Sequence, residues 1–355
     1  MSQLDRSTPQ STWALTNLQS ILERLLPLQE RPDGTLYAEL HGPHFIVVTK
    51  AFQRVRLWIL DPHHVNSGVI QSEMSLENPL HLVDPYTQAA ILGLAWVPDP
   101  QRIYCAGLGA GRVPMIFHHH LPQVTIDCTE IDPAVIEMAS RFFGLEPDLR
   151  FRVHLADGRR WLEGAGLYDL IFIDVFLDRG YVPYQLSTVE FYELCRQRLT
   201  SGGILVVNLL SEDDYLANRV ATLQQVFGEE AGAIMVCPLD EGNTVCFAVN
   251  ATSAQEVPDR ETVIQRATAI QEVQHFAFPF AMRALDLTTD LAQAEIDLTN
   301  AYPFYDEMPP ANYFDILPSF ENLPVQVDPT LPCPCGSGLL YGGCHGREDG
   351  LQVVR

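Results

Sequence analysis

Apolar residues change their spacing several times along the chain, and these changes predict an order of helices and strands. Residues 12–30 carry apolar positions at helical spacing after a Ser/Thr cap, which predicts a helix that packs on the rest of the protein. Residues 37–75 hold short β-branched or aromatic runs separated by DP, HH and NSG turns, which predict a small antiparallel sheet. A further helix is expected over residues 84–94.

Strands and helices alternate in the next part of the chain, residues 100–250. The strand-like runs RIYCAGL, VTIDCTEID, RFRVHLA, YDLIFIDVF and GGILVVNLL are nearly continuous in apolar residues, and helical patterns separate them. One of these helices, STVEFYELCRQRL, begins with a serine that we expect to be its cap. Such strands are typical of a parallel sheet covered on both faces, so we predict a doubly wound α/β fold.

The pattern divides the chain into five parts. We expect an N-terminal helical segment, a β-rich subdomain, a Rossmann-like nucleoside-binding domain, a helix followed by an irregular wrapping segment, and a small C-terminal module. Their predicted bounds are 1–36, 37–99, 100–250, 251–325 and 326–355.

Polar and glycine residues follow three successive strands of the α/β part. Gly107, Gly109 and Gly111 form G-L-G-A-G between a strand and a helix, where glycine lets the backbone approach a ligand closely. Glu130 ends the next strand, and Asp157 ends the one after it. A tight strand–helix turn also needs glycine, but the ordering of all three sites along one crevice predicts nucleoside binding.

The spacing of the glycines distinguishes between two kinds of nucleoside-binding loop. Dinucleotide-binding loops have G-x-G-x-x-G around a pyrophosphate at a helix N-terminus, whereas this loop is G-x-G-x-G. The shorter loop resembles that of S-adenosylmethionine-type Rossmann folds.

Several motifs together resemble the polyamine synthase (spermidine synthase) family. They are S-G-V-I-Q, a tyrosine, G-L-G-A-G, T-E-I-D-P, A-D-G, Y-D-L-I-F-I-D, L-S-T-V-E-F-Y and G-G-I-L-V-V-N, spread over residues 40–250. The resemblance implies a transferase that moves an aminopropyl group from decarboxylated S-adenosylmethionine to a polyamine-type amine and releases methylthioadenosine.

The resemblance also implies roles for individual residues. Gln71 would contact the nucleoside, Glu130 its ribose and Asp157 the adenine side, while Asp174 would be the catalytic acid and Tyr86 the substrate-side tyrosine. The chemistry agrees with the role of Asp174, because an alkylammonium cannot attack carbon until it loses a proton. A carboxylate can hold the cation, orient it and accept that proton.

Two departures from the family pattern leave the reaction open. Ala110 stands where the family loop carries an acid that grips the propylamine of the donor, and Asp174 and Asp178 are spaced by four residues without the family's proline. Tyr181 and Tyr184 are interpreted as acceptor-side residues, together with Asp178. Two alternatives therefore stand beside aminopropyl transfer: a methyltransferase that uses S-adenosylmethionine, and a non-catalytic nucleoside-binding adaptor.

The C-terminal module contains a compact set of metal-binding residue types. Its C-P-C-G-S-G-L-L-Y-G-G-C-H run resembles the SEC-C knuckle, and three thiolates with one imidazole suit tetrahedral zinc. Four protein ligands close the coordination sphere, so the predicted zinc is structural and supplies folding energy to a piece too short for a core. A protein partner for this knuckle is left open. The predicted ligands are Cys333, Cys335, Cys344 and His345.

Charge and hydropathy limit the remaining possibilities. The formal charge is −23, from 22 basic and 45 acidic residues, which argues against nucleic acid and anionic membranes as partners. No segment approaches about eighteen consecutive apolar residues, and the N-terminus does not have a signal-peptide pattern. We therefore expect a cytoplasmic protein. The family resemblance implies a small-molecule amine as substrate, and the sequence leaves homo-oligomer formation open.

Overall fold

A computed structural model describes most of the chain. The described residues are 9–41, 44–60, 70–176, 182–228, 233–240, 242–310 and 313. Within these ranges, no helix combines the length and the apolarity that a membrane crossing requires.

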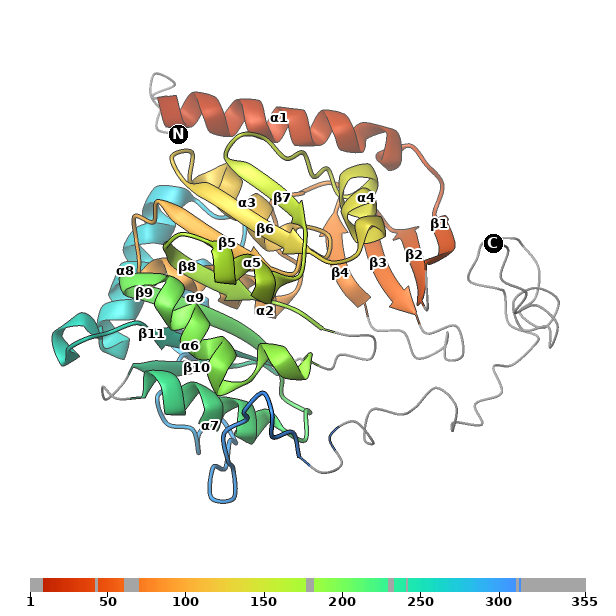
Figure 1. The fold of residues 1–355 in the computed structure, drawn as a ribbon. Coiled ribbons are helices and arrows are strands. Elements are labelled where there is room, and N and C mark those ends of the chain that lie inside the picture. The colour runs from red at the N-terminus through yellow and green to blue at the C-terminus, as the bar shows by residue number, and fades with distance from the viewer. Residues whose placement is uncertain are drawn as a thin grey trace, which may run out of the picture.

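The N-terminal helix α1 (Pro9–Gln29) lies along one side of the molecule and packs on α3 (Arg112–His120) (Figure 1). It buries Ile21 and Leu25 against the core, as the helical spacing predicted. The helix starts earlier than expected, with a proline at its first position, where the missing N–H costs nothing. The Ser/Thr pair therefore lies inside the helix and does not cap it.

A small antiparallel sheet follows, in the order β1-β2-β3-β4. Its strands are β1 (Gly34–His41), β2 (His44–Ala51), β3 (Arg54–Leu60) and β4 (Ile70–Ser75). Alternating apolar residues of β2 and β3 enter the main core, which fixes the register of the sheet. The sheet lies beside the larger one, β4 is its strand nearest the large sheet in Figure 1, and β2 contacts α4.

The central sheet has seven strands in the order β10-β11-β9-β8-β5-β6-β7. The five strands from β9 to β7 are parallel, and β11 and β10 continue the sheet as an antiparallel hairpin. The bounds are β5 (Arg102–Ala106), β6 (Thr125–Glu130), β7 (Phe151–Leu155), β8 (Tyr168–Ile173), β9 (Leu199–Leu210), β10 (Ile234–Pro238) and β11 (Asn243–Val249). The chain runs from β5 outward to β6 and β7, and then returns to the other side of β5 at β8. This reversal creates a crevice at the carboxyl ends of β5 and β8.

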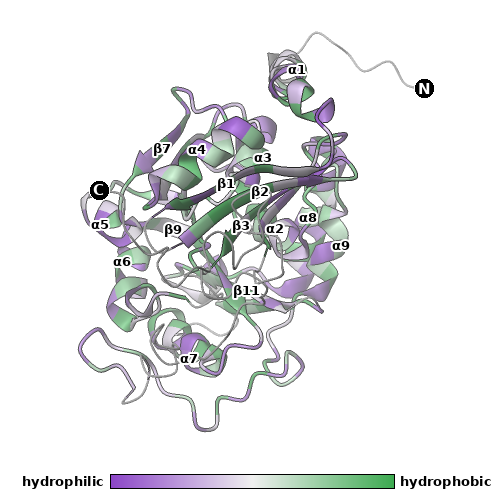
Figure 2. Cartoon of the chain, turned by 90° about the vertical axis from the view of Figure 1, so that its right-hand side faces the viewer, coloured by the Kyte–Doolittle hydropathy of each residue, from purple (hydrophilic) through white to green (hydrophobic). Residues whose placement is uncertain are grey.

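Helices cover both faces of this sheet. One face packs against α1, α3, α4 (Pro133–Phe142), α2 (Pro85–Ala90) and α8 (Arg260–Gln274), and the other against α5 (Gly158–Gly164), α6 (Val189–Arg198) and α7 (Leu216–Phe227). Successive residues of one strand enter opposite clusters, so Ile103 packs on the first face and Tyr104 on the second. Figure 2 shows strands that are mainly apolar and helices with one apolar side. The predicted doubly wound α/β sheet preceded by an antiparallel subdomain is confirmed.

Two local predictions were wrong. The helix expected over 84–94 divides into α2 and a 3₁₀ turn, η1 (Ile91–Ala95), which is buried under the sheet. The cap of α6 is Thr188, whose hydroxyl accepts a hydrogen bond from the Phe191 N–H at 3.3 Å. Ser187 instead donates its hydroxyl to the Tyr184 carbonyl at 3.0 Å, because the preceding 3₁₀ turn turns it away from the helix end.

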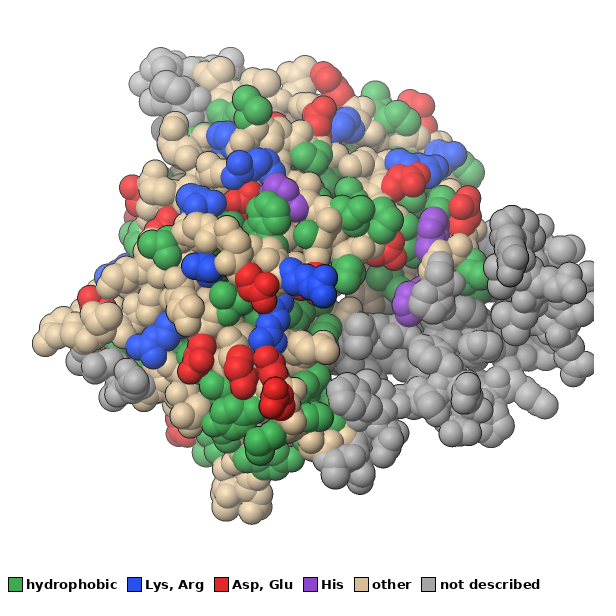
Figure 3. Space-filling model, viewed as in Figure 1, with side chains coloured by type: hydrophobic (Ala, Val, Ile, Leu, Met, Phe, Trp, Pro, Cys, Tyr) green, Lys and Arg blue, Asp and Glu red, His purple; other side chains and the backbone are tan. Residues whose placement is uncertain are grey.

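The segment after α8 has little regular structure. It contains the short helices α9 (Phe280–Arg283) and η5 (Ala284–Asp286), and then wraps the side of the molecule formed by α6 and α7 (Figure 1). The Phe304 carbonyl accepts a hydrogen bond from the Val189 N–H at 2.7 Å, which anchors the segment to the start of α6. On the face seen in Figure 3, acidic and basic side chains are interspersed among apolar ones.

Candidate nucleoside-binding site

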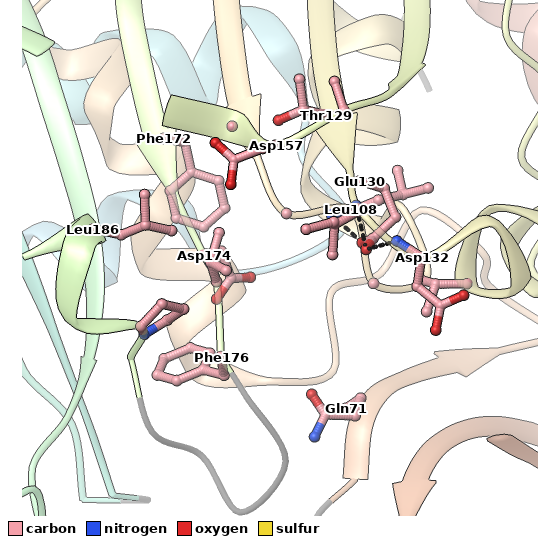
Figure 4. A pocket seen from close by; sticks show the side chains of 18 of the residues that line it. Gln71, Leu108, Thr129, Glu130, Asp132, Asp157, Phe172, Asp174, Phe176 and Leu186 are labelled. Atoms are coloured by element: carbon pink, nitrogen blue, oxygen red, sulfur yellow. Dashed lines mark hydrogen bonds between the residues drawn. The ribbon is translucent and has the colours of Figure 1, made fainter. Parts of the chain in front are cut away.

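A cavity of about 820 Å³ lies at the carboxyl ends of the central strands, between the two sheets. Every nucleoside-side residue predicted from the sequence lies in its wall, except for Gly111. The strand ends supply Glu130, Asp157 and Asp174, and β4 supplies Gln71 from the opposite side (Figure 4). The topology explains this convergence, because parallel strands on either side of the reversal end at the same edge.

The glycine loop is shaped by contacts with neighbouring strands. Gly107 has φ +88°, and a Cβ there would lie 2.1 Å from the carbonyl oxygen of Asp174. A side chain would thus push the loop away from the end of β8. Gly109 (φ +51°) approaches the Ser72 hydroxyl. Gly111 (φ +72°) is the N-cap residue of α3 and has a left-handed backbone conformation. Gly107 and Gly109 line the cavity, whereas Gly111 faces Leu145.

The carboxylate of Glu130 is held by backbone N–H groups. Its Oε1 accepts hydrogen bonds from Ile131 at 2.8 Å and Asp132 at 3.0 Å, and its Oε2 accepts one from Leu108 at 3.2 Å. Burial raises the pKa of Glu130, while these N–H donors oppose the shift. The side chain is thus fixed between the glycine loop and α4, with lone pairs left to accept hydroxyl groups of a ligand.

Asp157 is both a helix cap and a cavity residue. It precedes α5, and its Oδ1 accepts a hydrogen bond from the Arg160 N–H at 2.9 Å. The capping bond uses one oxygen and sets the rotamer, so the second oxygen is available to a ligand. Figure 4 shows the Asp157 carboxylate between Phe172 and Thr129, above the side chain of Asp174.

Asp174 directly follows β8 and lines the cavity. Its backbone N–H donates to the Ala106 carbonyl at 2.9 Å, and its Oδ1 accepts a hydrogen bond from the Asn208 amide at 2.9 Å. The pKa of Asp174 is raised to about 6, chiefly by burial and also by the charge of Asp84, while hydrogen bonds from Asn208 and the Tyr86 hydroxyl act in the opposite direction. A carboxylate with this pKa can accept a proton near neutral pH.

Tyr86 lies beside Asp174 in the first turn of α2. Burial raises its pKa well above the usual value, and the neighbouring charges of Asp174 and Asp84 add to the shift. The phenol therefore stays protonated, and it can donate a hydrogen bond to the Asp174 carboxylate.

Of the predicted acceptor-side residues, the structure describes only Tyr184, which is not among the residues that line the cavity. Tyr184 is 4% exposed, donates its hydroxyl to the Tyr305 carbonyl at 2.8 Å, and packs against Phe304. Its side chain therefore points away from the cavity, while the neighbouring Pro183 and Leu186 line it. Asp178 and Tyr181 lie outside the described residues.

Sequence reasoning missed residues that come from distant segments. Asp306, in the wrapping segment, lines the cavity and forms an ion pair with Arg159 of α5. Its Oδ1 also accepts the Thr188 hydroxyl at 2.7 Å, so it ties α5 to the start of α6. Asn208 was noted only as part of a strand motif, although a buried amide at the end of an apolar strand was a usable signal.

No cluster of three or more His, Cys, Asp or Glu suited to a metal occurs in the described part of the chain. The predicted zinc ligands lie outside that part, as does the whole module from residue 326. The five cysteines that are described, Cys105, Cys128, Cys195, Cys237 and Cys246, are free and buried.

Comparison with known proteins agrees with this geometry. The polyamine aminopropyltransferase of Vibrio vulnificus (strain CMCP6) is 33% identical over 233 residues, which cover 64% of this chain and 74% of that protein. The chain belongs to the polyamine aminopropyltransferase family. A family model described as the SEC-C motif matches residues 330–347. Both resemblances predicted from the sequence are confirmed.

Two further relatives extend the comparison. The human eEF1A lysine and N-terminal methyltransferase is 32% identical over 167 residues, covering 41% of this chain and 24% of that protein. The crystal structure of a probable spermidine synthase from Corynebacterium glutamicum superposes with a TM-score of 0.57 at 19% identity, covering 79% of this chain and 98% of that one. The second likeness concerns the fold. This chain is thus similar in sequence to transferases of two kinds.

Proposed function

We propose that this protein transfers an alkyl group from an adenosyl sulfonium donor to the nitrogen of an amine. The observation that carries the proposal is the position of Asp174, with a pKa of about 6, in the same cavity as the nucleoside-side residues Glu130 and Asp157. The donor's adenosine is expected to lie along the strand ends, with its ribose at Glu130 and its adenine toward Asp157. Gln71 would contact the nucleoside from the opposite wall.

The reaction follows from the charges in this arrangement. The amine arrives as an ammonium ion, which the Asp174 carboxylate attracts and orients, with Tyr86 beside it. Once the proton moves to Asp174, the nitrogen lone pair attacks the carbon next to sulfur. The carbon–sulfur bond breaks, its electron pair stays on sulfur, and the leaving thioether is neutral. No acid is needed for the leaving group, so one carboxylate suffices.

The family favours one version of this reaction. In it, an aminopropyl group moves from decarboxylated S-adenosylmethionine to a polyamine-type amine, and methylthioadenosine is released. Methyl transfer from S-adenosylmethionine is the second candidate. It is favoured by Ala110, whose buried methyl group replaces the acid that would grip the propylamine of a decarboxylated donor.

Product analysis tests the proposal. The purified full-length protein is incubated with each donor and a panel of amines, and methylthioadenosine and S-adenosylhomocysteine are quantified by mass spectrometry. We expect one of the two nucleosides to accumulate in proportion to the alkylated amine. Nucleoside binding without either product would contradict alkyl transfer and support the adaptor alternative.

We also propose that the SEC-C module binds one structural zinc through Cys333, Cys335, Cys344 and His345. Three thiolates and an imidazole within thirteen residues are the ligand types and number that tetrahedral zinc requires. Zinc would fold this module, separate from the transfer chemistry, and the module would be free to recruit a protein partner.

A further inference from the structure

Arg112 is a buried cation beside the glycine loop. It is the first residue of α3, lies two positions after Ala110, and contributes to the wall of the cavity although it is only 3% exposed. The helix α3, which Arg112 begins, contacts α2, and Tyr86 and Thr87 of α2 also line the cavity.

The guanidinium group forms no ion pair with a carboxylate in the part of the chain that the structure describes. Its Nη2 donates to the Pro79 carbonyl, its Nη1 lies 3.8 Å from the thioether sulfur of Met115, and its Nε–H is buried without an acceptor. A thioether is a weak acceptor, so these contacts leave most of the positive charge uncompensated. Burial lowers the pKa of Arg112 to about 10, and the charge of Asp84 opposes that shift.

Buried charges in proteins are normally paired, because an unpaired one costs free energy in proportion to its lost hydration. Around Arg112 the loop has lost the acid that the family resemblance implies, since Ala110 has no polar side-chain atom and its N–H donates to the Ser72 hydroxyl at 3.1 Å. The buried cation of Arg112 and the absence of an acid at position 110 both make the cavity beside the glycine loop more positive. An ammonium group on the donor would be repelled there, whereas a carboxylate would be attracted.

We infer that Arg112 recognises a carboxylate on the tail of the donor, so that the donor is S-adenosylmethionine with its carboxylate intact. The inference rests on the proposed alkyl transfer and selects between its two donors. Guanidinium–carboxylate bonds are charge-assisted and matched in shape, so one such contact discriminates strongly between the acid and its decarboxylated form.

A donor that keeps its carboxylate allows two transfer reactions, and both balance in atoms and electrons. An amine nitrogen that attacks the methyl carbon leaves S-adenosylhomocysteine, and one that attacks the first carbon of the tail leaves methylthioadenosine and transfers an aminocarboxypropyl group. In both cases the new carbon–nitrogen bond replaces one carbon–sulfur bond, the electron pair stays on sulfur, and the amine proton passes to Asp174.

Calorimetric titration with three nucleosides tests the inference on the full-length protein. The ligands are S-adenosylhomocysteine, the same molecule lacking its carboxylate, and methylthioadenosine, which has no tail. We expect the wild-type protein to bind S-adenosylhomocysteine at least about tenfold more tightly than the decarboxylated ligand. The Arg112→Met variant should lose this preference and keep its affinity for methylthioadenosine, whereas Arg112→Lys should keep part of the preference.

Arg266→Met is the matched control. Arg266 also donates to backbone carbonyls, those of Ala95 and Trp96, but lies outside the cavity wall, so its loss should leave all three affinities unchanged. Equal or tighter binding of the decarboxylated ligand by the wild-type protein would overturn the inference and leave alkyl transfer standing. Failure to bind methylthioadenosine as well would overturn the proposed function itself. The wild-type comparison decides even if the Arg112→Met protein does not fold.

Discussion

The side-chain amide of Asn208 donates a hydrogen bond to Oδ1 of Asp174 at 2.9 Å, across the neighbouring strands β9 and β8. Asn208 is 2% exposed, and its own oxygen accepts a hydrogen bond from the Asn243 amide at 3.0 Å. Because the Asn208 oxygen accepts from Asn243, the Asn208 side-chain amide has one orientation, in which its N–H₂ group points toward the Asp174 carboxylate. The strand pairing thus orients the acid to which we assign the proton transfer.

Removing this donor should change the pH dependence of activity. In the Asn208→Leu variant, Asp174 loses a hydrogen bond that favours its charged form, so its pKa should rise by about one unit. The acidic limb of the kcat/KM profile should move to higher pH by the same amount, with little change in the plateau. Asn243→Ala, which removes only the second amide, should cause a smaller shift. An unchanged acidic limb in Asn208→Leu would contradict the role of this bond.

The wild-type profile itself should report Asp174. Its pKa of about 6 lies above that of an unfolded aspartate, so the folded protein is protonated there below pH 6 and charged above it. We expect kcat/KM, measured from pH 5 to 8, to rise with an apparent pKa near 6. The Asp174→Asn variant should lose at least about a hundredfold in kcat/KM and still bind methylthioadenosine.

The same shift predicts a change in stability. Because the folded state favours the protonated form of Asp174, the stability that its protonation contributes is present below the unfolded pKa and is lost as pH rises through about 6. Asparagine cannot ionise, so Asp174→Asn should not have this loss. Thermal melts at pH 5 and pH 7.5 should show a smaller drop in Tm for the variant than for the wild type. An equal drop would mean that another group is responsible.

Asp157 offers a clean test of the adenine side. Asn at this position can still accept the Arg160 N–H and cap α5, so Asp157→Asn should leave Tm nearly unchanged. Affinity for methylthioadenosine should fall about tenfold if the second oxygen accepts from the nucleoside. Asp157→Ala, which removes the cap as well, should lower Tm in addition. Unchanged nucleoside affinity in both variants would place the adenine elsewhere.

Zinc content tests the C-terminal module independently. We expect about one zinc per chain by elemental analysis, and its loss in Cys335→Ser, because three remaining ligands hold the ion weakly. Cys246→Ala, which changes a buried cysteine of β11, is the control and should keep the metal. Methylthioadenosine affinity should be the same in all three proteins, since the cavity is built by other residues. Full zinc content in Cys335→Ser would contradict the assigned ligands.

The sequence by itself determined the fold class, the family and the residues that follow each strand. These features are local or periodic: alternating strand and helix patterns, glycines in a strand–helix turn, and acids at strand ends. Gly107 illustrates the point, because its need for φ +88° is visible as a glycine directly after an apolar strand. Strand ends that share one edge of a parallel sheet must lie together, so the convergence of Glu130 and Asp157 could also be foreseen.

Only the tertiary structure decided which other side chains surround the cavity. Asp306 reaches Arg159 from 147 residues away, and Asn208 reaches Asp174 across a strand pair, and no local pattern encodes such contacts. Tyr184, which is only two residues from Leu186, points into an aromatic cluster because a 3₁₀ turn rotates successive side chains to different sides. The burial of Arg112 without an ion pair among the described residues likewise follows from packing. A basic residue at a helix start is ordinarily solvated, and its burial becomes evident only when the loops around it are in place.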